Sequence, residues 1–479
     1  MDQALDPILN YKGASGVDFW AADPLLERTL APLLPEGDRA RELKALAAFG
    51  PVCGGKLGAL VEKAHRPENL PRLGKDESVA YCAEQKEARS ILARRLYDEP
   101  LSFPARMAVC VLANHNGEGG ITCPTAMNEG LIRLLERSGT EAQKARALPV
   151  LKSVDPENAL PAGQQITERQ GGSNVGANLT TAALQADGAW LLNGLKWFCS
   201  NPGNIWATTA KLSGTQVVGL FLVYHRLEDG KLNGHHLDKL KEICGTKGKG
   251  TAEIEYKDVR AELIGRGSQG MVLLSRLLGV SRIHVAAAAL GFIGRCVLEA
   301  KAFAKMREAY GRRIETIPSV ARTLAELELE KDACLLAFFE GVSAMDKDEP
   351  AAQALVPLLK IEVSKRATAV IRQTQLLIGG HGILEDFTVM PRLSQDSIVN
   401  EIWEGTHPIL AGHAVKALRR ADVFADFAKR LEGARPAAIK ELTARVAANR
   451  AMSEDERSLD DEELCTLAFQ TLTAALLSR

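Results

Sequence analysis

The chain has 479 residues, of which 46% are hydrophobic and 25% charged, as in ordinary globular proteins of two or three domains. Its 59 lysines and arginines balance 60 acidic residues, so the formal net charge of -1 excludes an overall attraction to nucleic acid or to anionic membranes. Nine scattered cysteines without a CxxC pair signal neither a disulfide framework nor a zinc site, and they indicate reduced thiols in the cytoplasm.

The start of the chain, MDQALDPILNYKG, lacks the basic flank and apolar run of a signal peptide. No uncharged apolar stretch reaches the roughly 20 residues that a membrane-spanning helix needs. We therefore expect a cytoplasmic protein that has no membrane span and holds no metal.

Helical periodicity dominates the first part of the chain. From about Asp23 to Val150, apolar residues recur three and four positions apart, as in PLLERTLAPLL and GLIRLLERSG, with interruptions at Gly and Pro. This pattern predicts an all-helical N-terminal domain over residues 1–160.

Strand signals replace the helical pattern in the next segment. LTTAALQADGAWLLNGLKWFCSNPGN contains short strand-like runs punctuated by Asp-Gly and Asn-Gly, dipeptides that favour tight hairpins. QVVGLFLVY and GTAEIEYKDV continue in β-favouring residues. We expect a small antiparallel β domain from roughly Gln164 to Leu263, within a middle domain of residues 161–270.

Long helices are predicted for the remainder. GVSRIHVAAAALGFIGRCVLEAKAFAKM and VARTLAELELEKDACLLAFFEGVSAM are rich in Ala and Leu and lack internal proline, as is typical of buried antiparallel bundle helices. We expect a C-terminal helical bundle over residues 271–420 and a helical extension of mixed charge over residues 421–479. The predicted fold class is α+β, mostly α.

Two glycine-rich segments are predicted to be connections and not phosphate loops. GRGSQG, residues 265–270, matches G-x-G-x-x-G, but it lacks the acidic residue about 20 positions later and the alternation of strand and helix that a dinucleotide-binding fold requires. GTKGKGT lacks the Gly-Lys-Ser/Thr ending of a phosphate loop.

A third glycine-rich segment, ITERQGGSN at residues 166–174, carries groups that suit a ligand. Backbone N–H groups at Gly171 and Gly172, with hydroxyls nearby, match a planar polar heterocycle or a phosphate, and a plain turn is the alternative. Trp197 in LKWFCSN also has two interpretations: it packs against neighbours in a strand, or it forms the wall of a cofactor site.

The segment NEIWEGTHPIL, residues 400–410, places the carboxylate of Glu404 between Trp403 and Gly405. The tryptophan ring takes space that water would use, and the glycine lets the backbone approach something closely. Glu404 is therefore either solvated on a turn or held out of water for chemistry.

Taken in chain order, ITERQGGSN, LKWFCSN, REAYG, IGGHG and IWEGTHPI resemble the motifs TEPxAGSD, W-x-T/S, R-x-x-F/Y-G, GGxG(Y) and EGT of the flavin-dependent acyl-CoA dehydrogenase family. Within that family, KWFCSNP, ITCPTAMNEG and NEIWEGT are most similar to the AidB-like, alkylation-response branch. The resemblance implies the acyl-CoA dehydrogenase fold: an N-terminal helical domain, a middle antiparallel β domain and a C-terminal four-helix bundle, here with a helical extension.

The resemblance also implies roles for individual residues. Glu404 would be the catalytic base that removes the α-proton of an acyl-CoA thioester while the β-hydride passes to flavin N5. Arg307 matches an arginine that reaches the FAD pyrophosphate of a neighbouring subunit, with a solvated helix arginine as the alternative. Substrate contacts are expected from Ser173, Arg282 and Gly405. The expected cofactor-binding residues are Gln165, Ile166, Thr167, Gly172, Ser173, Trp197, Phe198, Cys199, Ser200, Arg307, Gly379, Gly380, Trp403, Gly405, Thr406 and His407.

We therefore expect FAD-dependent α,β-desaturation of an acyl-CoA in fatty acid metabolism, with FAD between the β domain and the bundle. The expected assembly is a homodimer or homotetramer, and electrons would leave to an electron-transfer flavoprotein or to oxygen. One alternative is an AidB-like flavoprotein that binds duplex DNA, although KALRR and AKRLEGAR in the extension are offset by EDER and DDEEL. Another alternative is a regulatory flavoprotein that binds acyl-CoA with little turnover.

Overall fold

The computed structural model describes residues 8 and 10–479 and is mostly helical, with a seven-stranded sheet, which confirms the predicted fold class. The chain forms two compact units. The helical unit comprises Met1–Gly58, Leu101–Gly117 and Arg282–Arg479, and the sheet unit comprises Ala59–Pro100 and Glu118–Ser281. Residues of the predicted N-terminal domain thus contribute to both units, and the four-part division into domains stays a prediction.

The sheet unit is built on strands in the spatial order β3-β5-β4-β6-β7-β9-β8. Its position in the chain was predicted correctly, but the prediction of a purely antiparallel sheet was wrong, because β3 and β4 both run parallel to β6. β5 runs antiparallel to β3 and β4. The chain reverses once between β4 and β5 and again between β5 and β6, so β6 has the same direction as β3 and β4. The strands are β3 (Ala162–Gln165), β4 (Thr181–Leu184), β5 (Trp190–Ser200), β6 (Ile205–Leu212), β7 (Val218–Tyr224), β8 (His235–Leu240) and β9 (Thr251–Leu263).

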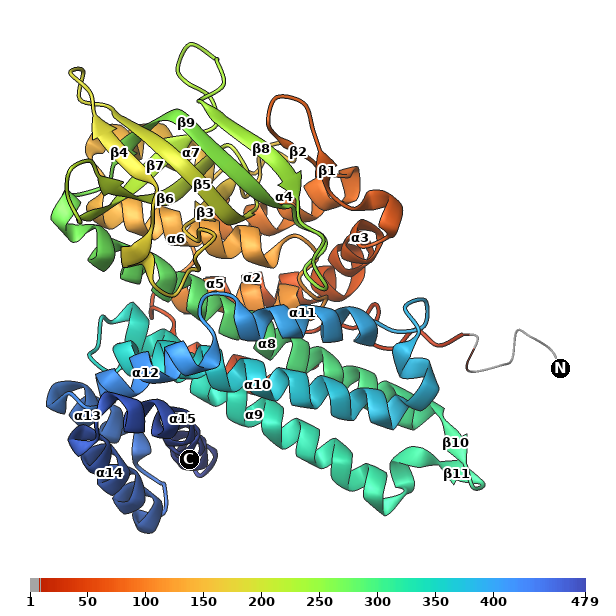
Figure 1. The fold of residues 1–479 in the computed structure, drawn as a ribbon. Coiled ribbons are helices and arrows are strands. Elements are labelled where there is room, and N and C mark those ends of the chain that lie inside the picture. The colour runs from red at the N-terminus through yellow and green to blue at the C-terminus, as the bar shows by residue number, and fades with distance from the viewer. Residues whose placement is uncertain (1–7, 9) are drawn as a thin grey trace. The chain divides into compact units, whose positions relative to one another are not determined.

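Helices cover one face of this sheet (Figure 1). α6 contacts β3, and α7 begins with a capping box in which Thr140 and Gln143 exchange hydrogen bonds. A short hairpin, β1 (Arg72–Leu73) with β2 (Val79–Ala80), interrupts the segment that was predicted to be all-helical. The helices of this part of the chain are α3 (Gly58–Ala64), α4 (Ala83–Tyr97), α6 (Thr122–Ser138) and α7 (Glu141–Leu151).

The predicted turns have mixed outcomes. Asp187 and Gly188 form the turn between β4 and β5, as expected, with Gly188 at φ +84°. Asn193 and Gly194 do not form a hairpin, because they lie at a β-bulge inside β5, where a Cβ on Gly194 would meet Thr180 Oγ1 at 2.5 Å. GRGSQG forms the predicted junction, a single 3-10 turn between β9 and α8.

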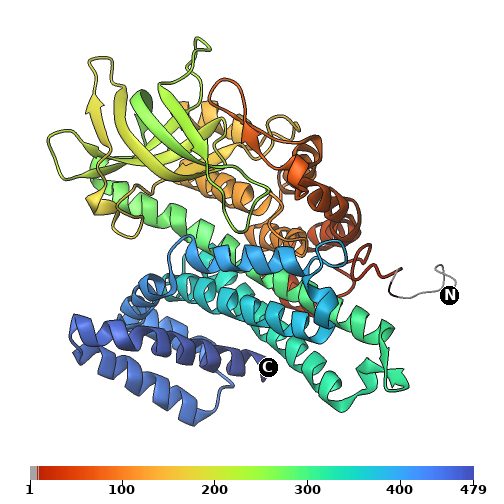
Figure 2. The same ribbon diagram turned by 45° about the vertical axis from the view of Figure 1, so that its right-hand side comes forward.

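The helical unit contains the predicted bundle, and its long helices lie side by side in both ribbon views (Figures 1 and 2). The β10–β11 hairpin (Glu308–Ala309 and Arg312–Arg313) projects from one end of these helices (Figure 1). The first turns of α8, up to Ser281, belong to the sheet unit. The bundle helices are α8 (Gly270–Met306), α9 (Pro318–Asp346), α10 (Ala352–Ile378), α11 (Met390–Ile402) and α12 (His407–Leu418), and the earlier helices of this unit are α1 (Pro24–Leu30), α2 (Arg39–Val52) and α5 (Phe103–Asn114).

The C-terminal extension is helical, as predicted, and packs along the bundle (Figure 2). α15 (Glu454–Leu477) contacts α9, α10 and α12, and it pairs with α14 (Pro436–Ala451). Ser453 caps α15 through a capping box with Glu456. The third helix of the extension is α13 (Ala421–Ala428).

Two helical stretches, Arg39–Ala64 and Gly267–Met306, have the length and apolar composition of a membrane-crossing helix. In the second stretch, 83% of the most apolar window is buried inside the protein, so packing against neighbouring elements accounts for its composition. In the first stretch the buried share is 50%. These helices are therefore weak evidence for a membrane protein.

Candidate functional site

Glu404 lies on a four-residue connection between the end of α11 at Ile402 and the start of α12 at His407. Its backbone is left-handed, with φ +58°, a conformation that costs free energy for any residue except glycine. Gly405 follows at φ +114°, and a Cβ there would meet Leu410 Cδ2 at 2.8 Å. The connection therefore holds Glu404 in a strained position, and only glycine fits after it.

The Glu404 carboxylate is in an environment that favours its protonated form. Its Oε2 atom is buried and accepts no hydrogen bond from the described part of the chain. Burial raises the pKa of Glu404, and the positive charges of Arg282 and Lys360 offset only part of that effect. Of the two interpretations drawn from the sequence, the carboxylate held out of water agrees with this geometry.

Two cations from other helices hold the backbone around Glu404. Arg282 of α8 donates from Nε to the Glu404 carbonyl at 3.1 Å. Lys360 of α10 donates from Nζ to the carbonyls of Glu401 at 2.9 Å and of Gly405 at 2.7 Å. Arg282 was predicted from the sequence but Lys360 was not, although Lys360 is a lone lysine in the apolar run ALVPLLKIEV.

The remaining predicted residues of this connection lie around Glu404. Trp403 is partly buried, and Thr406 occupies the N-cap position of α12. His407 Nε2 lies 3.6 Å from the carboxylate of Glu401, which also bonds Thr368. Burial, together with Lys365 and Lys360, lowers the pKa of His407, so its imidazole is neutral near pH 7.

Gly379, Gly380 and Arg307 lie on exposed parts of the helical unit. Gly379 ends α10 at φ +74°, and a Cβ on either glycine would meet nothing within 4 Å. Arg307 is exposed at the end of α8, where the β10–β11 hairpin begins and where Tyr310 is 95% exposed. Both a contact with a second molecule and a solvated arginine are open to Arg307 at this surface, so its role stays a prediction.

In the sheet unit, the TERQGGSN segment is fixed at its base by the buried Glu168. The Glu168 carboxylate accepts hydrogen bonds from Lys196 Nζ at 2.8 Å, Thr180 Oγ1 at 2.6 Å and the Leu179 N–H at 2.6 Å. Burial alone would raise the pKa of Glu168, but Lys196 and these hydrogen bonds outweigh it and lower the pKa to about 2. Glu168 is therefore an ionised structural anchor, and Gly172 and Ser173 beyond it are exposed.

The predicted flavin-facing residues of the sheet unit divide into buried and accessible groups. Ile166 and Gln165 are buried, and Gln165 Oε1 accepts a hydrogen bond from Tyr256 Oη. Cys199 is fully buried in the core of the sheet, so its thiol faces away from any surface site. Burial also raises the pKa of that thiol.

The accessible group consists of Thr167, Trp197, Phe198 and Ser200. The backbone N–H of Trp197 donates to the Thr167 carbonyl at 2.8 Å. Phe198 is 50% exposed, and Lys241 Nζ lies 3.5 Å from the centre of the Trp197 ring. Exposed aromatic rings beside an ammonium group, next to an exposed Gly-Ser segment, fit a planar ring system that carries phosphates. The residues of this unit thus fit FAD.

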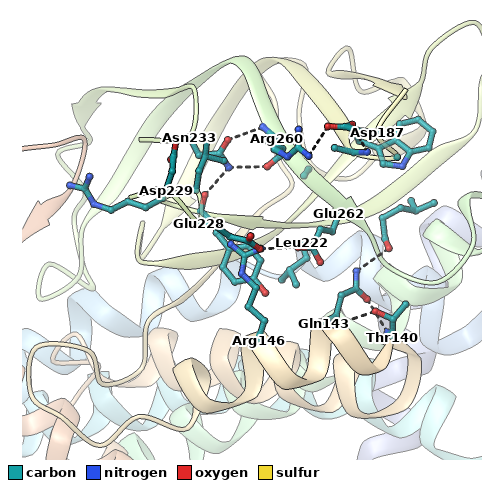
Figure 3. Close-up of a pocket in the computed structure, with 18 residues that line it drawn as sticks. Thr140, Gln143, Arg146, Asp187, Leu222, Glu228, Asp229, Asn233, Arg260 and Glu262 are labelled. Carbon is teal, nitrogen blue, oxygen red and sulfur yellow. Dashed lines mark hydrogen bonds and ion pairs between the residues drawn. The ribbon is translucent and has the colours of Figure 1, made fainter. Parts of the chain in front are cut away.

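A separate pocket of about 690 Å³ lies in the sheet unit between the start of α7 and the ends of β7 and β9 (Figure 3). Arg146 of α7 reaches towards the sheet, where it ion-pairs with Glu262 at 3.1 Å and Glu228 at 3.2 Å. None of the predicted site residues lines this pocket. Arg260 also pairs with Asp187, so two of the three arginines that line the pocket have acidic partners in its wall.

Comparison with known proteins identifies the family. Models of the middle domain and the C-terminal domain of acyl-CoA dehydrogenases match residues 163–259 and 268–418. Acyl-CoA dehydrogenase family member 11 of Caenorhabditis elegans is 30% identical over 446 residues, which cover 86% of this chain and 72% of the relative. Putative acyl-CoA dehydrogenase AidB of Escherichia coli is 28% identical over 335 residues, 67% of this chain and 61% of the relative.

Solved structures agree with the sequence relatives. The structure of Caenorhabditis elegans ACDH-11 in complex with C11-CoA has a TM-score of 0.88 and 26% identity, with 98% of this chain and 88% of that chain covered. Bd2924 in its apo-form also has a TM-score of 0.88, at 25% identity and 98% coverage of both chains. The chain therefore belongs to the acyl-CoA dehydrogenase family of FAD-dependent oxidoreductases.

Proposed function

We propose that this enzyme desaturates an acyl-CoA thioester between its α and β carbons, with Glu404 as the base that takes the α-proton. One observation carries the proposal: Glu404 is held in a strained backbone conformation with a buried carboxylate oxygen that accepts no hydrogen bond from the described residues. A strained, desolvated carboxylate costs folding free energy. Such groups are therefore found mainly at active sites, where the reaction uses them.

The environment of Glu404 suits the removal of a weakly acidic proton. A thioester α-proton requires a base whose affinity for protons is raised, and burial raises the pKa of Glu404. Bound FAD would supply the hydride acceptor for the β-carbon. Glu404 would hold the α-proton on its carboxylate, and the Trp403 ring beside it would help to exclude water.

The substrate class follows from chemistry and from one relative. The ACDH-11 structure holds C11-CoA, which supports an acyl-CoA thioester as the ligand of this chain as well. Anaerobic titration of the flavoprotein with acyl-CoAs of increasing chain length, followed by bleaching of the flavin absorbance, would identify the preferred acyl group. Rapid bleaching supports the dehydrogenase, and a spectral shift without bleaching would support the alternative of an acyl-CoA-binding regulatory protein.

Glu404→Gln tests the base directly. The variant keeps the size of the side chain and loses its basicity, so we expect retained flavin and a rate of flavin reduction that is lower by about 10²- to 10⁴-fold. Glu454→Gln, at an exposed glutamate in the first turn of α15, is the matched control and should reduce flavin at the parent rate. A flavin-containing Glu404→Gln protein that is reduced as fast as the parent would show that another group is the base.

The alternative of an AidB-like protein that binds duplex DNA has its own test. In the extension, Arg430 pairs with Glu340 and Asp426, and Arg445 pairs with Asp460 and Glu463, so these cations are already neutralised. Fluorescence anisotropy with labelled duplex DNA at low salt would reveal an affinity that falls steeply with added salt if basic side chains displace counterions. Binding that is absent at low salt would remove this alternative.

Assembly and electron transfer stay predictions. The exposed Arg307 beside the β10–β11 hairpin supports a homodimer or homotetramer in which this arginine contacts the FAD of a neighbouring subunit. An electron-transfer flavoprotein or oxygen would accept the electrons, and reoxidation of the reduced enzyme by each acceptor would distinguish them.

A further inference from the structure

Lys360 is an unusual lysine because its side chain is completely buried. It has 0% exposure, in the middle of α10, among residues such as Leu358, Leu359 and Ile361 that are also fully buried. An ammonium group removed from water is costly unless it is paired or hydrogen-bonded. The partners of Lys360 therefore indicate what the group contributes.

Both hydrogen-bond acceptors of Lys360 are backbone carbonyls of the connection that carries the base. Nζ lies 2.9 Å from the Glu401 carbonyl and 2.7 Å from the Gly405 carbonyl, on either side of Glu404 in the chain. A single group thus joins the last turn of α11 to the residue after the base. Because Glu404 is in a strained conformation, its position depends on contacts of this kind.

We propose that Lys360 is a positioning residue for Glu404, which fixes the connection through two hydrogen bonds to its backbone carbonyls and brings a positive charge to the connection. This inference rests on the proposed function of Glu404 as the base. It assigns Lys360 two separable effects, one on the mobility of the connection and one on the pH at which Glu404 ionises.

The charged groups that face Lys360 come from the elements around it. The pKa of Lys360 is affected by Glu404 on the connection, Glu401 at the end of α11 and Arg282 of α8. Its charge in turn affects the pKa of His407 at the start of α12. Burial lowers the pKa of Lys360 to about 7, Arg282 acts in the same direction, and the two glutamates act in the opposite direction. Below neutral pH, the ammonium is therefore charged and favours the ionised form of Glu404.

The carboxylates of α9 and α15 that lie along α10 have other partners. Glu330 pairs with Arg366 at 2.8 Å, and Glu462 pairs with Lys365 at 3.1 Å. After losing its proton near pH 7, Lys360 still has two N–H groups for its two carbonyls. The hydrogen bonds therefore persist across neutral pH, while the charge does not.

Hydrogen–deuterium exchange of the flavoprotein tests the positioning effect without requiring turnover. Lys360→Met removes the charge and both hydrogen bonds from a side chain of similar length, so we expect amides in the peptide 400–410 to exchange about 10-fold faster. The matched control is Lys331→Met, at a buried lysine of α9 that pairs with Asp23 and Asp332. Exchange of peptide 400–410 should be unchanged in that control.

The pH profile of flavin reduction by acyl-CoA tests the electrostatic effect. Without the positive charge, Glu404 ionises at higher pH, so the acid limb of the profile should move up by about one pH unit in Lys360→Met and Lys360→Gln. The glutamine keeps an N–H donor, so Lys360→Gln should recover part of the exchange protection that Lys360→Met loses. The Lys331→Met profile should follow the parent.

The outcomes separate the two proposals. If the parent is reduced by acyl-CoA and both Lys360 variants keep its exchange rates and pH profile, the assignment of Lys360 is wrong and the proposed function stands. If no acyl-CoA reduces the parent, the proposed function fails, and the exchange data alone decide whether Lys360 positions the connection. If Lys360→Met does not fold with flavin, the same comparisons with Lys360→Gln decide the matter.

Discussion

At Glu404, one residue combines a left-handed backbone, a buried carboxylate oxygen and a glycine neighbour that no larger residue can replace. A left-handed conformation at a non-glycine residue costs on the order of 1–3 kcal/mol, and burial of a carboxylate costs more. Folding alone gives no reason to keep both costs at one residue. A reaction that needs a basic carboxylate gives such a reason.

The pH dependence of flavin reduction follows from the raised pKa of Glu404. If Glu404 is the base, only its ionised carboxylate accepts the α-proton, so the rate should fall as the pH drops through the raised pKa. The acid limb should therefore lie above the ordinary glutamate pKa of 4.5. Stopped-flow reduction with a saturating acyl-CoA from about pH 4 to about pH 9 measures this limb, and a flat rate down to about pH 4 would contradict the assignment.

Gly405→Ala should lower the free energy of unfolding and remove most of the flavin reduction by acyl-CoA. Its φ of +114° is unfavourable for alanine, and the new Cβ would lie 2.8 Å from Leu410 Cδ2, so we expect a loss of about 1–3 kcal/mol in the free energy of unfolding. Gly412→Ala, inside α12, is the control, because its Cβ would have Asp461 Oδ2 as its nearest contact, at 3.6 Å. Thermal unfolding of both variants should show destabilisation only at Gly405.

At the scale of elements, the Glu168–Lys196 pair joins the TERQGGSN segment to β5. Both side chains are almost fully buried, and Lys196 Nζ also donates to the Thr209 carbonyl at 2.8 Å. The segment that presents Gly172 and Ser173 is therefore tied to the strand that leads to Trp197 and Phe198. The two segments of the sheet unit that are predicted to bind flavin are joined for this reason.

Glu168→Gln should strongly destabilise the sheet unit. It leaves the Lys196 ammonium buried without its anionic partner, which typically costs about 3–5 kcal/mol. Glu255→Gln, at a 41% exposed carboxylate of β9 that pairs with Lys257, should cost at most about 1 kcal/mol. Thermal unfolding and flavin content would show whether the buried pair matters as expected.

The same pair gives the parent a pH-dependent stability with a defined sign. The folded-state pKa of Glu168, about 2, lies below its ordinary value of 4.5, so its contribution is complete above about pH 4.5. It is lost as the pH falls towards 2, and the magnitude is about 3 kcal/mol, at about 1.4 kcal/mol per pH unit. Glu168→Gln should remove this part of the acid sensitivity.

At the scale of the whole molecule, the C-terminal extension is part of the core of the helical unit. Phe469 of α15 is 1% exposed and lies 4.6 Å from the guanidinium of Arg366 on α10, the helix that also carries Lys360. Thr466 donates to Glu362 on the same helix at 3.0 Å. The extension therefore supports the helix that holds the connection around Glu404.

Phe469→Ala should cost about 3–5 kcal/mol, because it leaves a cavity between α15 and the bundle. Leu459→Ala is the control on the same helix, since Leu459 is 83% exposed and its removal should change the free energy of unfolding by less than about 0.5 kcal/mol. Chemical denaturation of both variants would measure the difference. Equal stabilities would mean that the extension packs only loosely on the bundle.

The sequence by itself determined the elements and the type of chemistry. Helical periodicity located α8 and α9, and β-favouring runs located β4 to β7 and β9. The order of short motifs indicated the acyl-CoA dehydrogenase family, which is confirmed, and predicted Glu404 as the base. These features are local, because they depend on the spacing of apolar residues and on motif residues that are close in the chain. The mixed sheet, the bulge at Gly194 and the inward-facing Cys199 were not recoverable in this way, since each depends on which strands become neighbours.

Only the tertiary structure decided how Glu404 is held. The cations near it, Arg282 and Lys360, come from helices that are distant in the chain, and the lysine has no motif of its own. Likewise, the sequence showed Glu168 in a motif but not its burial against Lys196. Desolvation and hydrogen bonding set the pKa of each carboxylate, and both arise only when separate elements pack together.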